Sequence, residues 1–285
     1  MPHAPTAEIH PSSRDATLGY RRFDTQDLDD AVLLSRRLGW PHRREDWAHM
    51  LEVGQGIALR NDSGQLVGTG FCTDHGSMAT IGLIIVDDAW QGRGLGREIM
   101  MHLMALAGER PIALVATTAG APLYRKLGFE TCNLVCQYQG IIEPIQAPSM
   151  PNLRQIRASD RDALLALVPG NPVHALAVRE ATHGVVLAVE GRIEGCALWR
   201  DFGRGHHIGP VLADSDTAAR ALIQALLAEH EGRFVRLDLV DPDPDDDWLQ
   251  SAGLRCVERI ERMRRGVLPE IPGPARVGLT TQTMG

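Results

Sequence analysis

Hydrophobic positions along the chain follow two periods. Residues 81–86 form an apolar, β-branched run, which predicts a buried strand. After it, apolar side chains recur at Leu95, Ile99, Leu103 and Leu106, the spacing of an amphipathic helix. A short segment with three glycines separates the two patterns. The sequence therefore predicts a strand, a glycine-rich loop and a helix in direct succession.

The same periods predict the elements around this motif. Helices are expected over residues 25–37, 44–53 and 120–127, with Thr25 as the N-cap of the first. Strands are expected over residues 18–23, 56–60, 65–73, 77–86, 112–116 and 129–139. Turn residues between the middle three strands predict an antiparallel meander.

The pattern repeats in the second half of the chain. Residues 153–160 parallel 20–27, and residues 184–187 parallel 56–59. Residues 208–214 parallel 81–87, and Gly253-Leu254 parallels Gly128-Phe129. We therefore predict a tandem α/β protein with two units, each a mixed, mostly antiparallel sheet flanked by helices.

The repeat sets the predicted domain boundaries. The first repeat covers residues 17–141 and the second covers 153–268, with a proline-containing linker at 142–152. The ends, residues 1–16 and 269–285, are predicted to be tails, the first of them loose.

Composition narrows the class of protein. The chain has 285 residues, 44% hydrophobic content and a net charge of −7, which describes a folded protein without a basic nucleic-acid-binding face. The sequence shows no signal peptide and no apolar run long enough to span a membrane. Five scattered cysteines without local metal-ligand spacing suggest reduced thiols. We expect a cytoplasmic protein that uses neither metal nor nucleic acid.

A strand, glycine loop and helix in this order can present backbone N–H groups to a phosphate. A dinucleotide fingerprint starting at Gly92 would need a glycine at position 97, where Arg97 stands. A P-loop would need Gly-Lys-Ser/Thr, and Lys126 is the only lysine in the chain. The pattern Gln-x-x-Gly-x-Gly is met at residues 91–96. A glycine-rich turn without a ligand is the remaining alternative.

Preceded by Ile-Ile-Val-Asp, that pattern resembles the coenzyme A pyrophosphate loop of the GNAT superfamily of N-acetyltransferases. The later segment Ala-Pro-Leu-Tyr-Arg-Lys-Leu-Gly-Phe-Glu, residues 121–130, resembles the GNAT segment in which a tyrosine-bearing helix ends at glycine and re-enters a strand through phenylalanine. The resemblance implies an α+β GNAT fold in both repeats. It also places the helical pair 25–37 and 44–53 over the acceptor cleft.

The resemblance implies roles for particular residues. Ile84, Ile85 and Val86 match the strand edge that hydrogen-bonds the pantetheine arm and polarises the thioester carbonyl. The residues that match the pyrophosphate loop are Gln91, Gly92, Arg93, Gly94, Leu95 and Gly96. Tyr124 matches the tyrosine that protonates the departing thiolate. Packing in the core is the alternative role for the strand residues and for Tyr124.

The general base is not evident. Residues 77–86 contain no acid, and Asp74 and His75 lie in a turn whose polarity explains them. His206 and His207 in the second repeat are further candidates, as is a water chain. Thr117 and Thr118 stand where many relatives have a coenzyme-contacting Asn, so that contact stays open.

The second repeat lacks the residues that carry the chemistry. An offset of 127 residues, from Ile81 to Ile208, places three apolar residues against the loop: Ala218 against Gln91, Ala221 against Gly94 and Ile223 against Gly96. Leu249 stands against Tyr124, and only Arg220, against Arg93, is kept. Side chains at these positions keep a loop from approaching a pyrophosphate closely. We predict a degenerate, non-catalytic copy that shapes the acceptor side.

The resulting hypothesis is an enzyme that moves an acetyl group from acetyl-CoA to the primary amine of a small molecule or amino acid. Alternatives are another acyl-CoA donor, a peptide N-terminus as acceptor, or a coenzyme-A-binding sensor without turnover. The sequence leaves the acceptor and the oligomeric state open.

Overall fold

The computed structural model describes residues 18–242, 247–270 and 273–283. The chain forms two compact units: an N-terminal unit that ends at Ile112 and a C-terminal unit that begins at Ala113. This division follows packing, whereas the predicted boundaries at 141 and 153 follow the repeat, and those boundaries remain a prediction. Residues 1–16, predicted to be a loose tail, lie outside the described residues. No described helix has the length and apolar character needed to cross a membrane.

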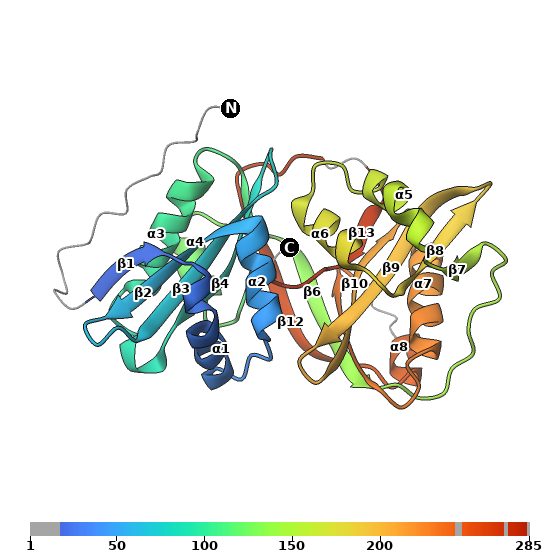
Figure 1. The fold of residues 1–285 in the computed structure, drawn as a ribbon, viewed down its shortest axis with the longest axis horizontal. Helices are drawn as coiled ribbons and strands as arrows, with labels where there is room; N and C mark the ends of the chain where they lie inside the picture. The colour runs from blue at the N-terminus through green and yellow to red at the C-terminus, as the bar shows by residue number, and fades with distance from the viewer. Residues whose placement is uncertain (1–17, 243–246, 271–272, 284–285) are drawn as a thin grey trace. The chain divides into compact units, whose positions relative to one another are not determined.

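The N-terminal unit is built on four antiparallel strands in the order β1-β2-β3-β4 (Figure 1). Its strands are β1 (Leu18–Arg22), β2 (Gly54–Asn61), β3 (Leu66–Asp74) and β4 (Ala79–Val86). Its helices are η1 (Thr25–Asp27), α1 (Leu28–Arg37), α2 (Arg44–Val53), η2 (Asp88–Trp90) and α3 (Leu95–Ala107). The predicted meander and the predicted helix at 44–53 are confirmed.

Helices cover both faces of this sheet, because successive side chains of a strand point to opposite sides. Gly70 of β3 faces α3 so closely that a Cβ there would lie 2.7 Å from both Ile99 and Leu103. Its neighbour Phe71 points the other way, 5.9 Å from the ring of Trp47 in α2. The missing side chain at Gly70 thus lets α3, the helix that follows the glycine loop, pack close to the sheet.

The C-terminal unit contains a sheet in the order β5-β12-β6-β11-β13-β10-β9-β8-β7. Its strands are β5 (Ile112–Ala116), β6 (Glu130–Ile141), β7 (Leu153–Gln155), β8 (Gly184–Val189), β9 (Arg192–Phe202), β10 (Gly205–Ala213), β11 (Phe234–Val240), β12 (Arg255–Arg265) and β13 (Ala275–Gly278). Its helices are α4 (Ala121–Lys126), η3 (Ala158–Asp160), α5 (Arg161–Ala166), α6 (Pro172–Glu180), α7 (Asp216–Ala228) and α8 (Asp247–Ser251).

The two repeats exchange their last strands. By the repeat, β6 corresponds to β12 and β5 corresponds to β11. In the structure β5 neighbours β12, while β6 pairs with β11, for example Leu237 with Tyr138. The exchanged strands also pair antiparallel with each other, with Val135 opposite Ile260. Strand β6, predicted over residues 129–139, therefore has both of its neighbours, β12 and β11, in the second repeat.

Two glycines make this exchange possible at one end of the ladder. A Cβ on Gly140 of β6 would lie 2.0 Å from the carbonyl oxygen of Gly253, just before β12. A Cβ on Gly253 would lie 2.2 Å from the carbonyl oxygen of Ile141. Gly253 also has a φ of +90°, which favours glycine. The two backbones therefore approach to a distance that only glycine permits.

Local hydrogen bonds confirm the repeat. Arg21 contacts Asp27 at the start of the first repeat, and Arg154 contacts Asp160 in the same way in the second. The pKa of Asp160 is lowered chiefly by its hydrogen bond from Arg154. Phe129 N–H donates to the carbonyl of Tyr124 over 3.0 Å, and Leu254 N–H donates to that of Leu249 over 2.9 Å. These equivalent turns support the alignment of Leu249 with Tyr124.

Two details of the sequence analysis need correction. The N-cap at the first helical segment is Asp24 rather than Thr25, because its carboxylate accepts the N–H of Gln26 over 2.8 Å and no hydroxyl is needed. The C-terminal tail contains β13, which the sequence did not predict. The strand has four residues and its hydrogen-bond partners lie far away in sequence, so no periodic pattern announces it.

We expect Gly140→Ala to lower the free energy of unfolding by about 2 kcal/mol, because the added methyl group overpacks against a backbone carbonyl that cannot rotate away. Urea denaturation of the full chain measures this. Gly19→Ala is the control, since a Cβ there meets nothing within 4 Å. Equal stability of the two variants would show that the ladder has room to relax.

Candidate functional site

The strand before the glycine loop carries a bulge. Phe71 pairs with Gly82 and Thr69 pairs with Ile85, so β4 has one more residue than β3 over this stretch. Leu83 sits at the bulge with a φ of +50°, a strained conformation for a leucine. The hydroxyl of Thr69 donates to the carbonyl of Leu83 over 2.9 Å and holds it in place.

The bulge decides which side chains of the predicted pantetheine edge belong to the core. Ile85 is 1% exposed and is therefore a core residue. Ile84 and Val86 are half-buried. The three residues of this edge thus differ in burial, and the side chain of Ile85 belongs to the core.

Hydrogen bonds fix the turn that follows β4. The carboxylate of Asp87 accepts the N–H of Ala89 over 3.0 Å and the guanidinium of Arg37 over 2.7 Å. Gln91 donates to the carbonyl of Val86 over 3.1 Å and to Asp88 over 2.8 Å. Gln91, at the position of the family glutamine, therefore stabilises the start of the loop. Asp87 and Arg37 tie this loop to α1, a role that the sequence analysis missed.

Glycine is required at two of the three loop positions for conformational reasons. Gly92 has a φ of +76° and Gly94 a φ of +84°, both in the left-handed region. Gly94 is the N-cap of α3. Gly96 lies inside the first turn of α3 and is not among the residues with positive φ. Positive φ values thus explain the glycines at positions 92 and 94, and Gly96 leaves its side of the helix start free of a side chain.

The loop leaves backbone N–H groups open just before and at the N-terminus of α3. In the part of the chain that the structure describes, no protein acceptor takes the N–H groups of residues 92–96. The α3 helix that follows has 13 residues, so its dipole favours an anion at this end. The guanidinium of Arg93 lies over the ring of Trp90, 4.6 Å from its centroid, and adds a positive charge. The arrangement suits a phosphate group.

Tyr124 lies on α4 in the C-terminal unit, whereas the glycine loop belongs to the N-terminal unit. Its assignment to the same catalytic centre rests on the resemblance. The side chain is 7% exposed and packs over Gly120, where a Cβ would lie 2.9 Å from the phenol oxygen. Burial raises the pKa of Tyr124 to about 12. Its hydroxyl has no hydrogen-bond partner among the described residues, so the proton is available for donation.

The four candidates for a general base are all engaged. His75 contacts the hydroxyl of Thr80 over 3.0 Å, and Asp74 pairs with Arg110. In the C-terminal unit the Nε2 atom of His207 lies 3.2 Å from the carboxylate of Asp238. The ring of His206 lies 4.4 Å from that of Trp199. The Nδ1 atoms of His206 and His207 are buried without a hydrogen-bond partner among the described residues.

The second repeat replaces the loop by helix. Helix α7 begins at Asp216, and Ser215 caps it by accepting the N–H of Ala218 over 3.2 Å. Ala218 and Ala221, the counterparts of Gln91 and Gly94, both lie inside this helix. Their backbone N–H groups are therefore used by the helix and its cap rather than presented to a ligand.

Pro210 stands at the counterpart of the bulge residue Leu83, by the same offset. Proline has no N–H to offer, so the strand itself also loses a donor at this point. The neighbouring bulge of β10, between Ile208 and Val211, is nevertheless kept. The second repeat thus keeps the bulge of the strand and lacks one backbone donor there.

Comparisons with known proteins agree with this geometry. The family described as acetyltransferase (GNAT) domain matches residues 54–131, and another family with the same description matches residues 174–272. This chain belongs to the GNAT acetyltransferases, with two GNAT domains in tandem. The GNAT acetyltransferases are acyltransferase enzymes.

Relatives of this GNAT chain match it over most of its length. An uncharacterised N-acetyltransferase, YitH of Bacillus subtilis, is 29% identical over 228 residues, covering 76% of this chain and 80% of the relative. A putative acetyltransferase from Pyrococcus horikoshii shares the fold, with a TM-score of 0.76, 22% identity and coverage of 98% and 99%. A tandem GNAT protein from the clavulanic acid biosynthesis pathway has a TM-score of 0.62, 14% identity and coverage of 89% and 99%.

No group of three or more His, Cys, Asp or Glu side chains could hold a metal ion within residues 18–242, 247–270 and 273–283. The described cysteines are free thiols.

The loop conformation predicts opposite effects at two glycines. Gly94→Ala should lower the stability by about 1 kcal/mol, because its left-handed φ is unfavourable for a residue with a Cβ. Gly96→Ala should raise it by about 0.5 kcal/mol, because alanine is favoured inside a helix. Thermal unfolding of both full-length variants measures the two effects. A loss of stability at Gly96 would show that the helix start is strained or crowded.

Proposed function

We propose that this protein is an N-acetyltransferase that binds acetyl-CoA at residues 84–96 and transfers the acetyl group to the primary amine of a small molecule or amino acid. The observation that carries the proposal is the set of open N–H groups at residues 92–96, which follow a bulged strand and begin a long helix. A pyrophosphate needs several donors that converge without side chains between them. Within the described chain, this segment offers five open N–H groups, and three of its five residues are glycines.

The residues present fit the coenzyme in charge as well as in shape. Arg93, held over Trp90, supplies a counter-charge for the phosphates. The backbone at Ile84 and Val86 takes the pantetheine arm, and a backbone N–H near the bulge polarises the thioester carbonyl. Bound acetyl-CoA supplies that carbonyl carbon as the electrophile. Preorganised donors of this kind contribute a few kcal/mol to transition-state stabilisation.

The transfer proceeds by direct attack. The neutral amine forms a C–N bond to the carbonyl carbon, the C–S bond breaks, and the amine proton leaves to solvent. Tyr124 gives its phenolic proton to the departing thiolate, and the resulting phenolate takes a proton back from solvent. Its pKa of about 12 keeps the phenol protonated over the working pH range, which an acid requires. The second repeat binds no coenzyme and shapes the acceptor side.

Coenzyme binding tests the proposal. Gly94→Val should abolish binding of acetyl-CoA, because a branched side chain both strains the left-handed φ and stands at the start of the donor cluster. Titration calorimetry gives affinity and stoichiometry, with a cooperative melt as the check on folding. Ala221→Val, at the matching position inside α7, is the control and should bind one coenzyme with unchanged affinity. Unchanged binding by Gly94→Val would remove the basis of the proposal.

Turnover tests the role of Tyr124. Tyr124→Phe should lower kcat by about 100-fold and leave coenzyme affinity nearly unchanged, because only the proton donor is lost. In the wild type, kcat/KM should rise with pH as the acceptor amine loses its proton. At pH values up to about 11, kcat/KM should show no second, descending limb, because the phenol of Tyr124 loses its own proton only near its raised pKa. Release of free thiol over a panel of amines provides the assay.

The panel also decides between the alternatives. Coenzyme binding without thiol release for any amine of the panel would indicate a sensor without turnover. Thiol release with peptides alone would indicate a peptide N-terminus as acceptor. Faster turnover with a longer acyl-CoA than with acetyl-CoA would indicate a different acyl donor. Wild-type turnover in Tyr124→Phe would assign Tyr124 to packing.

A further inference from the structure

The central strands of the second repeat separate, and a third strand lies between them. Strands β10 and β11 are parallel and pair over three positions only, from His206 with Val235 to Ile208 with Leu237. Beyond that point β13, from the C-terminal tail, lies between them in the sheet order. The opening between β10 and β11 is thus occupied by the chain itself.

The tail segment, residues 275–282, pairs with both walls of this opening. On β10, Val211 pairs with Gly278 and Ala213 pairs with Ala275, in antiparallel register. On β11, Leu239 pairs with Gly278, and Leu279 N–H donates to the carbonyl of Asp238 over 2.9 Å. The tail segment therefore satisfies backbone groups on both strands at once.

The fit is close at two glycines. A Cβ on Gly278 would lie 2.8 Å from a methyl carbon of Val211. A Cβ on Gly209 would lie 2.0 Å from the carbonyl oxygen of Leu279. Leu279 itself is 2% exposed and packs with Val135 and Ile260. The opening accepts this particular segment and has no room for added side chains at these points.

A buried polar group holds the end of the tail segment. The amide nitrogen of Gln282 donates to the carboxylate of Asp238 over 3.1 Å and to Gln137 of β6 over 3.2 Å. Asp238 is fully buried and also accepts hydrogen bonds from Arg236 and lies beside His207. Burial alone would raise the pKa of Asp238, but these partners outweigh it and keep the carboxylate charged.

The strand β10, with which the tail segment pairs, indicates what the tail segment replaces. By the repeat, residues 211–213 of β10 correspond to residues 84–86 of β4, the edge assigned to the pantetheine arm in the first repeat. We infer that the tail segment is a built-in strand ligand of the second repeat. It occupies the place that the pantetheine arm of an acyl-coenzyme A takes in a coenzyme-binding repeat. The opening recognises the amino-acid sequence of this segment.

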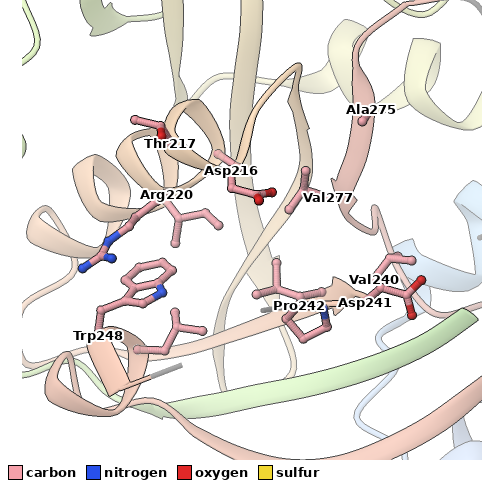
Figure 2. A pocket seen from close by; sticks show the side chains of 13 residues that line it. Asp216, Thr217, Arg220, Val240, Asp241, Pro242, Trp248, Ala275 and Val277 are labelled. Carbon is pink, nitrogen blue, oxygen red and sulfur yellow. The ribbon is translucent and has the colours of Figure 1, made fainter. Parts of the chain in front are cut away.

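A cavity of about 390 Å³ remains beside the tail segment (Figure 2). Ala275 and Val277 form one wall, and α7, the end of β11 and α8 form the others. Asp216 and Asp241 bring carboxylates to its lining. The carboxylate of Asp241 accepts hydrogen bonds from the Asn133 side chain and from the N–H of Leu134. The negative charge of the two aspartates disfavours a phosphate group beside the tail segment.

The third charged residue in the described lining of the cavity is Arg220, which stacks on a tryptophan. The guanidinium of Arg220 lies over the ring of Trp248, 5.0 Å from its centroid. Arg220 is the counterpart of Arg93, which lies over Trp90 in the first repeat. The stacked arginine is therefore kept in both repeats, while the open backbone donors are not.

Peptide complementation tests the inference. A chain that stops after Glu270 should unfold at a temperature at least 5 °C below that of the full chain. A synthetic peptide of residues 273–283 should bind it with 1:1 stoichiometry and restore most of that difference. The same peptide with Gly278→Val should bind at least 30-fold more weakly, because of Val211. A peptide with Ala275→Ser, whose side chain is exposed, is the matched control and should bind like the wild type.

The full chain gives a second test that does not require the truncated form to fold. Hydrogen exchange of the Leu279 amide should be at least 100-fold slower than in an unstructured peptide. Gln282→Ala should speed it at least 10-fold while amides of β2 and β3 are unaffected. Free exchange at Leu279 in the wild type, or a peptide that fails to bind a folded truncated chain, would overturn the inference. So would a second equivalent of acetyl-CoA on the truncated chain, because the tail segment would then be a removable cover over a working site.

Discussion

The antiparallel pairing of β6 with β12 is the contact on which the C-terminal unit depends. Each strand is the last of its own repeat, and each has its second neighbour in the other repeat's part of the sheet. Removing either repeat would leave the remaining exchanged strand with unpaired N–H and C=O groups and exposed apolar side chains. The second repeat is therefore required whether or not it has a catalytic role, because it completes the sheet that contains β5 and β6.

The two repeats show how one framework can gain or lose a phosphate site through the start of a single helix. In the first repeat, left-handed glycines delay the start of α3 to Leu95, and several N–H groups precede it. In the second, Ser215 caps α7 at once and the chain is already helical at the matching positions. Residues with a Cβ disfavour the left-handed turn, so the N–H groups enter the helix. The difference in open N–H groups between the two repeats follows from ordinary helix capping.

Much of the fold and of the candidate loop could be predicted from the sequence because the deciding signals are local. Helix α2 was predicted to the residue, and glycine at positions 92 and 94 indicated the left-handed turns that the structure contains. The bulge at Leu83 could not be predicted, because leucine has no preference for a positive φ and tertiary contacts such as that with Thr69 impose it.

Non-local pairing was the other limit. The sequence shows that residues 129–139 form a strand, but the choice between β5 and β11 as its neighbour depends on partners a hundred residues away. The tail strand β13 is the extreme case: its neighbours supply its conformation. For the catalytic site, the residues themselves indicate the phosphate loop, whereas the role of Tyr124 rests on the resemblance and on a burial that suits a proton donor.

The backbone of the second repeat explains why its opening is filled. Where β10 and β11 separate, residues 211–213 lose their parallel neighbour, and buried N–H and C=O groups without partners each cost roughly 1–3 kcal/mol. A working repeat leaves such groups for a coenzyme that comes and goes. A repeat that no longer binds one needs a permanent partner, and a segment of the same chain is always present at high effective concentration. In the proposed function, the absence of a coenzyme from the second repeat and the presence of β13 therefore meet one requirement, that the opening between the strands be occupied.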